Sequence, residues 1–183
     1  MNYAAIKPRD IANGPGVRVS LFVSGCTHHC KGCFNEVAWD FDYGTPFTEE
    51  TAAQVLELLA PSFIRGLTLL GGEPFEPQNQ APLVALLRQV RARYPEKTIW
   101  AYTGYVLERD LLSGRVGNPE TVQAYLTLLD VLVDGPFLQE QKNLSLRFRG
   151  SENQRLIDLK QTLAAGKTIL WTDWQGQGKG MIP

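Results

Sequence analysis

Three segments of the chain repeat apolar residues at the spacing of an α-helix. The apolar positions recur at i, i+3, i+4 and i+7, so they form one stripe on a helix whose other positions are polar. Thr48 and Asn118 stand where each can cap the first turn of a helix, and acidic residues follow both. The pattern predicts three amphipathic helices, over residues 52–59, 83–90 and 122–129.

Short apolar runs lie between these helical segments and have the length of β-strands. Most are apolar at successive positions and rich in β-branched and aromatic residues, as in a parallel sheet that helices cover. They comprise residues 17–23, 67–70, 98–102 and 131–133. We expect a half-exposed strand over residues 144–148, where apolar and polar residues alternate, and a further strand over residues 167–171.

The alternation of strands and helices predicts an α/β fold with mostly parallel strands. Four predicted strands run directly into glycine-rich or polar motifs, which is typical of barrel-like α/β enzymes whose sites lie at the carboxyl ends of the strands. These motifs are a loop with cysteines, Gly71-Gly72-Glu73-Pro74, Thr103-Gly104-Tyr105 and Asp134-Gly135-Pro136. A complete barrel typically takes about 250 residues. The five to six strands predicted here therefore indicate a partial (β/α) barrel with an open side.

Length, composition and charge limit the possible classes of protein. The 183 residues, 44% of them hydrophobic and 20% charged, are typical of one globular domain, which we assign to residues 1–172. We expect residues 173–183 to form a flexible tail. A net charge of −1 gives no bulk field for nucleic acid or an anionic membrane. Neither a spanning segment nor a signal peptide is evident, so we expect a cytoplasmic protein.

All three cysteines lie within eight residues, as Cys26, Cys30 and Cys33. An odd, clustered set is a poor disulfide framework, whereas thiolates on one loop are typical ligands of soft metals. Structural zinc normally takes four ligands, and no fourth cysteine exists. A 4Fe-4S cube held by three thiolates leaves one iron open for a substrate, so the spacing favours that cluster. Zinc completed by His28 or His29, and unliganded thiols, stay as alternatives, although we expect both histidines to face solvent.

The spacing C-x3-C-x2-C after the first strand, followed by Gly-Gly-Glu after the second, resembles the radical S-adenosylmethionine (SAM) enzymes. The resemblance implies that the three cysteines hold one 4Fe-4S cluster whose open iron binds SAM. In that family an electron from the reduced cluster splits SAM into methionine and a 5′-deoxyadenosyl radical. The resemblance places Gly71, Gly72 and Glu73 beside the methionyl amino group, which bare backbone carbonyls can approach closely. It implies no catalytic side chain beyond the cluster and the cofactor.

One position departs from the usual pattern of that family, in which an aromatic residue before the last cysteine packs on the adenine. Gly32 stands there in this chain, and Phe34 follows the cysteine. We expect the backbone of Gly32 and Cys33, together with the Phe34 ring, to contact the adenine. Packing of Phe34 in the core is the alternative interpretation.

Further stretches narrow the resemblance to the activating enzymes of glycyl-radical proteins, and among them to the activators of anaerobic ribonucleoside-triphosphate reductase. The resemblance covers most of residues 1–158, with GVRVSLFVSGC, CKGCFNEVAW, GGEPFEPQN, DVLVDGPF and LRFRGSENQR. It implies the large subunit of that reductase as partner and a reductant protein such as flavodoxin or ferredoxin as electron donor. A pyruvate formate-lyase activase, another small radical SAM enzyme, and a zinc-stabilised interaction module without catalysis stay open as alternatives.

Several other polar residues have two interpretations each. Tyr102, Thr103 and Tyr105 could meet a ribose with a hydroxyl group or serve only packing and turn formation. Asp134 could face the site or stabilise its Asp-Gly turn. Arg147 and Arg149 could bind a carboxylate of a partner or substrate, or lie on the solvated face of a strand.

Overall fold

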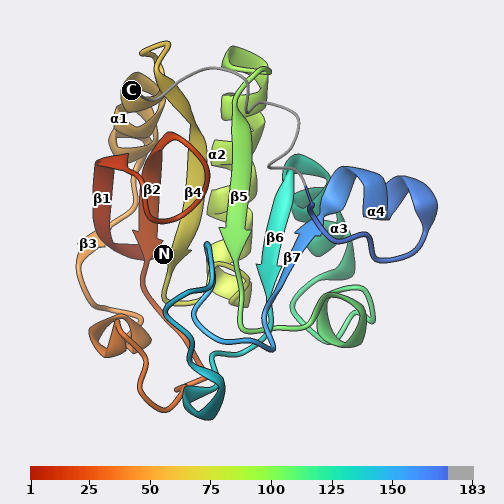
Figure 1. The fold of residues 1–183 in the computed structure, drawn as a ribbon. Coiled ribbons are helices and arrows are strands. Elements are labelled where there is room, and N and C mark those ends of the chain that lie inside the picture. Colours follow the sequence, from red (N-terminus) through yellow and green to blue (C-terminus); the bar gives the residue numbers. More distant parts are fainter. Residues whose placement is uncertain (173–183) are drawn as a thin grey trace, which may run out of the picture.

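The computed structural model describes residues 1–172, so the tail predicted over residues 173–183 lies outside the described residues. The chain builds one seven-stranded mixed sheet with the order β3-β1-β2-β4-β5-β6-β7 (Figure 1). The strands are β1 (Asn2–Asp10), β2 (Val17–Val23), β3 (Thr45–Pro46), β4 (Ile64–Gly71), β5 (Thr98–Tyr102), β6 (Val131–Asp134) and β7 (Arg155–Asp158).

The middle of the sheet confirms the prediction of an α/β fold with parallel strands. β2, β4, β5 and β6 are parallel neighbours in that order. Antiparallel strands flank them on both sides, with β1 and β3 at one edge and β7 at the other. The sheet therefore has seven strands, where five to six were predicted.

The strand predictions differ in outcome according to burial. The four continuous apolar runs are all strands of the central sheet. The prediction for residues 144–148 was wrong, because this segment forms turns and its Leu144 side chain is 90% exposed. The run over residues 167–171 contributes only a single bridge, between Leu170 and Ile157. β1 and β7 were missed because both mix charged and apolar residues without a clear period.

The three predicted helices are present as α1 (Glu49–Leu59), α2 (Pro77–Arg93) and α3 (Pro119–Leu128). Thr48 and Asn118 cap the helices as predicted, because each side chain accepts a hydrogen bond from a backbone N–H in the first turn. A further short helix, α4 (Leu159–Ala165), was missed, since seven residues are too few for a periodic stripe. Among residues 1–172, no helix combines the length and apolar character needed to cross a bilayer.

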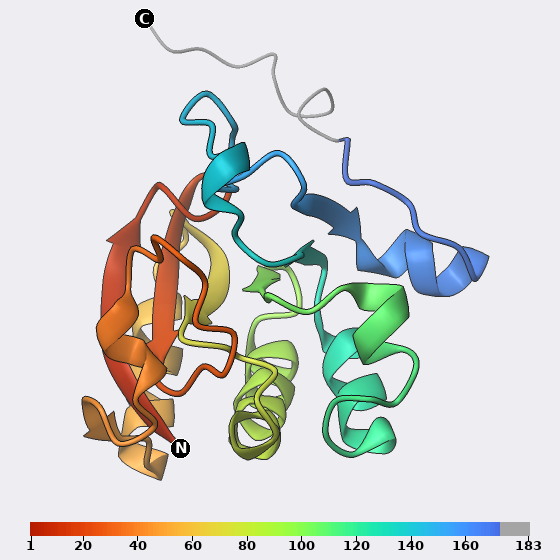
Figure 2. The ribbon, with the colours of Figure 1, turned by 90° about the horizontal axis from the view of Figure 1, so that it is seen from below.

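The two faces of the sheet are covered differently. α1, α2 and α3 lie on one face of the sheet (Figure 2). Their apolar stripes pack against the inward side chains of the parallel strands. The opposite face holds a smaller apolar cluster around Trp100, against which Phe148 and Trp171 pack. Phe148 belongs to the long loop between β6 and β7, residues 135–154. This β6–β7 loop lies at the end of the sheet toward which the parallel strands point (Figure 1).

Candidate functional site

A cavity of about 430 Å³ lies at the carboxyl ends of the parallel strands. The segments that follow β2, β4 and β5 form one part of its wall, and the β6–β7 loop forms another. All residues predicted from the sequence to hold the cluster or the cofactor line this cavity, namely Cys26, Cys30, Gly32, Cys33, Phe34, Gly71, Gly72 and Glu73. The structure thus brings together two motifs that lie about forty residues apart along the chain.

The cysteine loop, residues 25–35, begins directly after β2. Cys26 is buried, whereas Cys30 and Cys33 are partly exposed, and all three are free thiols. Burial raises the pKa of Cys26 to about 12, and it also raises the pKa of Cys30. The backbone N–H groups of His28 and His29 lie on the side of the sulfur and oppose this rise in the pKa of Cys26. The thiol of Cys26 therefore stays protonated at neutral pH unless a metal displaces its proton.

The donors on the cavity fit an iron–sulfur cube. Backbone N–H groups face two of the sulfurs, including that of Cys33, which accepts from Asn35 N at 3.4 Å. Hydrogen bonds of this kind are among the contacts by which proteins tune iron–sulfur clusters. Within residues 1–172, no three Cys, His, Asp or Glu side chains lie close enough together to hold a single metal ion. A cube makes no such demand, because each thiolate binds a different iron.

The prediction that His28 faces solvent was wrong. Its Nε2 lies 3.0 Å from Glu73 Oε2, and its ring meets the Tyr105 ring edge-on at a centroid distance of 4.4 Å. Burial lowers the pKa of His28, but the hydrogen bond and the charge of Glu73 outweigh it, so the pKa is raised. His29 is exposed as predicted and lies against Trp39, with ring centroids 4.7 Å apart. The Glu73 contact escaped prediction because it joins residues 45 positions apart.

The carboxylate of Glu73 is buried and hydrogen-bonded by the protein itself. It accepts hydrogen bonds from Phe75 N at 2.8 Å and Gly104 N at 2.7 Å, in addition to its contact with His28. The Glu73 side chain therefore ties the end of β4 to the end of β5 and to the cysteine loop.

Gly71 and Gly72 approach the protein's own backbone. A Cβ atom at Gly72 would lie 2.5 Å from the Gly25 carbonyl oxygen and 2.8 Å from that of Ala38. Gly71 has a φ of +113°, and a Cβ there would meet the backbone of Phe22 at 2.8 Å. The sequence suggested that the absence of side chains at these glycines allows a close approach to an ammonium group. In the structure, the same absence allows the segment to pack closely against β2 and the cysteine loop.

Phe34 lines the cavity but is 80% exposed, so the alternative that it packs in the core was wrong. Tyr102 donates its hydroxyl to the Phe148 carbonyl oxygen at 2.8 Å, and Thr103 Oγ1 accepts from Tyr105 N at 3.1 Å. These contacts agree with the packing and turn roles of the two residues, and both residues also line the cavity.

The β6–β7 loop is held at its base by the segment that reads RGSENQ. Gln154 accepts from Gly150 N at 2.8 Å and donates to Gly135 O at 3.1 Å, which closes the loop. Arg149 donates to the Gln154 carbonyl oxygen at 2.6 Å and lines the cavity, so it is not on a strand face. Arg147 is exposed, and its guanidinium lies 5.5 Å from the centre of the Phe148 ring.

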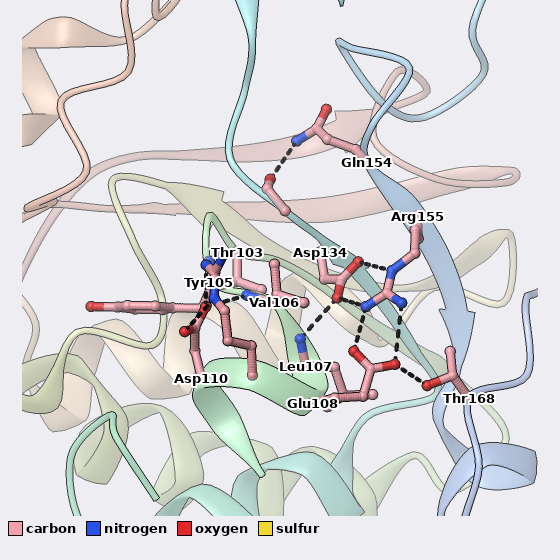
Figure 3. A network of polar contacts seen from close by, with 12 residues as sticks. Thr103, Tyr105, Val106, Leu107, Glu108, Asp110, Asp134, Gln154, Arg155 and Thr168 are labelled. Carbon is pink, nitrogen blue, oxygen red and sulfur yellow. Dashed lines mark hydrogen bonds and ion pairs between the residues drawn. The ribbon is translucent and has the colours of Figure 1, made fainter. Parts of the chain in front are cut away.

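Asp134 is not among the residues that line the cavity, and its side chain belongs to a polar network (Figure 3). Its buried carboxylate accepts from Leu107 N at 2.9 Å and from two guanidinium nitrogens of Arg155, at 2.9 and 2.5 Å. Arg155 also bonds Glu108 at 2.7 Å, and this partner holds the pKa of Glu108 at about 2. The network joins β6, β7 and the short π-helix η2 (Leu107–Leu111), so Asp134 supports the framework of the site.

We expect Arg155→Met to destabilise the protein by about 3 kcal/mol, because it leaves the carboxylate of Asp134 buried without its cation. The matched control is Arg109→Met. Arg109 also pairs with an aspartate but is 60% exposed, so its loss is expected to leave the unfolding midpoint close to that of the wild type. Urea unfolding of the metal-free proteins measures both. Equal midpoints for the two variants would contradict the structural role given to Arg155.

A mixed sheet whose parallel central strands bring three thiols and two glycines to one cavity at their carboxyl ends defines an α/β protein with a candidate soft-metal site. The family model described as a 4Fe-4S single cluster domain matches residues 12–157, which supports an iron–sulfur cluster over zinc.

Three relatives share the name anaerobic ribonucleoside-triphosphate reductase-activating protein. That of Pasteurella multocida is 43% identical over 166 residues, which are 88% of this chain and 99% of the relative. That of Escherichia coli (strain K12) is 43% identical over 87% of this chain and 100% of the relative. That of enterobacteria phage T4 is 44% identical over 85% and 93%. The chain belongs to the family of anaerobic ribonucleoside-triphosphate reductase-activating proteins.

Proposed function

We propose that the protein activates anaerobic ribonucleoside-triphosphate reductase by generating a glycyl radical on its large subunit. Relatives that carry the name of such an activating protein over nearly their whole length support this proposal. The observation that carries it is the meeting of the three thiols with the Gly-Gly-Glu segment on one cavity. Residues 1–172 would act as one domain of radical SAM type, with the central strands as its partial (β/α) barrel.

Each segment on the cavity has a role in this proposal. Cys26, Cys30 and Cys33 hold the 4Fe-4S cluster by their thiolates. The backbone of Gly71, Gly72 and Glu73 lies beside the methionyl amino group of SAM. Gly32, Cys33 and the exposed ring of Phe34 contact the adenine, for which an aromatic face with free surface is suited.

These positions define what the bound groups would do. Held by Cys26, Cys30 and Cys33, the cluster would supply the electron that splits the sulfur–C5′ bond of SAM into methionine and a 5′-deoxyadenosyl radical. This chemistry would remove a hydrogen atom from a glycine Cα of the reductase and give 5′-deoxyadenosine and a glycyl radical. A reductant protein such as flavodoxin or ferredoxin replaces the electron. We place this reaction in the cytoplasm, where clustered thiols stay reduced.

The protein's own residues admit the target and hold the cofactor in place. The β6–β7 loop forms a wall of the cavity and carries Leu144, which is 90% exposed and also lines the cavity. Lys142 and Arg149 line the same wall and give it a positive charge. An open cavity of this kind suits a peptide segment that enters from a large partner better than a small metabolite that must be enclosed.

Anaerobic reconstitution with iron and sulfide, followed by reductant and SAM, tests the proposed function. We expect 5′-deoxyadenosine and methionine in equal amounts, measured by liquid chromatography. Stoichiometric zinc with no cleavage of SAM would instead support the zinc-stabilised interaction module. Cleavage of SAM with activation only of pyruvate formate-lyase would support the alternative activase.

A further inference from the structure

The three residues between Cys26 and Cys30 are each held by a side chain from elsewhere in the chain. Thr27 bonds Glu76, His28 bonds Glu73, and His29 lies against Trp39. Glu73 and Glu76 both belong to the segment GGEPFE, which follows β4. The short cysteine loop is therefore positioned by two carboxylates three residues apart.

The contact of Glu76 with Thr27 is the tighter of the two. Glu76 is only 4% exposed, and its Oε1 accepts from Thr27 N at 2.8 Å and from Thr27 Oγ1 at 2.6 Å. Two hydrogen bonds from one residue to one oxygen fix both the backbone and the side chain of Thr27. Glu76 directly precedes α2, whose N-terminus favours a negative charge and so lowers the cost of burying this carboxylate.

Thr27 connects this carboxylate to the first cysteine. It follows Cys26 directly, so its two hydrogen bonds to Glu76 fix the backbone that leaves the first cysteine. On the other side, Cys26 N donates to Trp39 O at 3.2 Å. Hydrogen bonds thus fix the backbone on both sides of this sulfur, and those on the C-terminal side are accepted by Glu76. Hydrogen bonds to thiolate sulfur help set the reduction potential of an iron–sulfur cluster.

We propose that Glu76 is a positioning residue of the cluster site, which acts through Thr27 to aim backbone N–H groups at the sulfur of Cys26. The proposal rests on the proposed function, since it requires a cluster on these cysteines. It assigns to Glu76 and Thr27 a role in the electronic properties of the cluster, in addition to their part in packing.

Two pairs of variants separate positioning from charge and from packing. Glu76→Gln keeps an acceptor oxygen for Thr27, whereas Glu76→Ala removes it. Thr27→Ser keeps the hydroxyl, whereas Thr27→Val removes it without a change in net charge. Glu36→Ala is the matched control, because Glu36 is an exposed acid that follows the cysteine loop closely.

The measurements are the electron paramagnetic resonance spectrum and the midpoint potential of the reduced, iron-loaded proteins. We expect Glu76→Ala and Thr27→Val to shift and broaden the spectrum, and Thr27→Val to lower the potential because an N–H donor is misaligned. Glu76→Gln, Thr27→Ser and Glu36→Ala should retain the wild-type spectrum. The double variant of Glu76→Ala with Thr27→Val should differ from wild type no more than the larger single change does.

Two results would overturn the proposal. If iron-loaded Glu76→Ala and Thr27→Val give the wild-type spectrum and potential, the two residues serve folding only. If Glu76→Ala does not fold, the comparison of Thr27→Val with Thr27→Ser decides the question by itself. A wild-type protein that takes up no cluster would overturn the proposed function as well, so the two failures are distinguishable.

Discussion

Replacement of any one of Cys26, Cys30 and Cys33 by alanine is expected to abolish the cluster and all cleavage of SAM. The chain has no other cysteine that could substitute for the lost thiolate. A cube held by two protein ligands also has a second open iron, which exposes it to solvent and loss of metal. Iron and sulfide content after anaerobic reconstitution, together with the charge-transfer absorption, measures the effect directly.

The control for this prediction is His29→Ala, in the same loop. His29 is exposed, so its replacement should leave the iron content at the wild-type level. A Cys→Ala variant that retains a full cluster and cleaves SAM would show that the assigned ligand is wrong. A loss of iron in His29→Ala equal to that in the cysteine variants would indicate that the whole loop is merely fragile.

Substitution of Gly72 by valine is expected to displace the cysteine loop and prevent assembly of the cluster. A Cβ atom there would come within 2.5 Å of Gly25 O and 2.8 Å of Ala38 O, and neither backbone oxygen can rotate away as a side chain would. Overpacking of this kind costs about 1–3 kcal/mol of stability. The effect reaches the cluster because Cys26 follows Gly25 directly. Thermal unfolding and iron content measure the two consequences.

Gly166→Ala is the matched control for Gly72→Val. Gly166 has a φ of +63° but no atom within 4 Å of the added Cβ, so only the backbone conformation is strained. We expect a cost of about 1 kcal/mol in stability and a normal iron content. If Gly72→Val matches the wild type in both stability and iron content, the close approach of the two loops does not support the site.

The parts of the fold that could be predicted are those encoded in local patterns. Continuous apolar runs predicted the central strands because both faces of those strands are buried. The helices followed from the spacing of their apolar stripes and from two capping residues. β1 was missed because a strand whose residues are mostly partly exposed has no need for such a pattern. The alternation at residues 144–148 predicted a strand, but these residues form turns in a loop. Gln154 holds the base of this loop by accepting a hydrogen bond from Gly150 N.

The candidate site likewise has parts that the sequence predicts and parts that only the folded structure shows. Cysteine spacing and glycine-rich strand ends predicted which residues line the cavity, since parallel strands bring their carboxyl ends to one edge. The cofactor and the partner came from the resemblance, not from composition or periodicity. The contacts of His28 with Glu73 and of Thr27 with Glu76 join residues 45 and 49 positions apart. Only the folded chain shows them, although the second acid in GGEPFE was a signal in the sequence.

The transfer of deuterium from the reductase tests the central claim most directly. Anaerobic ribonucleoside-triphosphate reductase with glycine deuterated at Cα is mixed anaerobically with the reconstituted protein, reductant and SAM, and the 5′-deoxyadenosine is analysed by mass spectrometry. We predict one deuterium in the 5′-deoxyadenosine, because the radical takes its hydrogen atom from the glycine of the partner. Ample 5′-deoxyadenosine without deuterium would contradict the assignment of the reductase as the target.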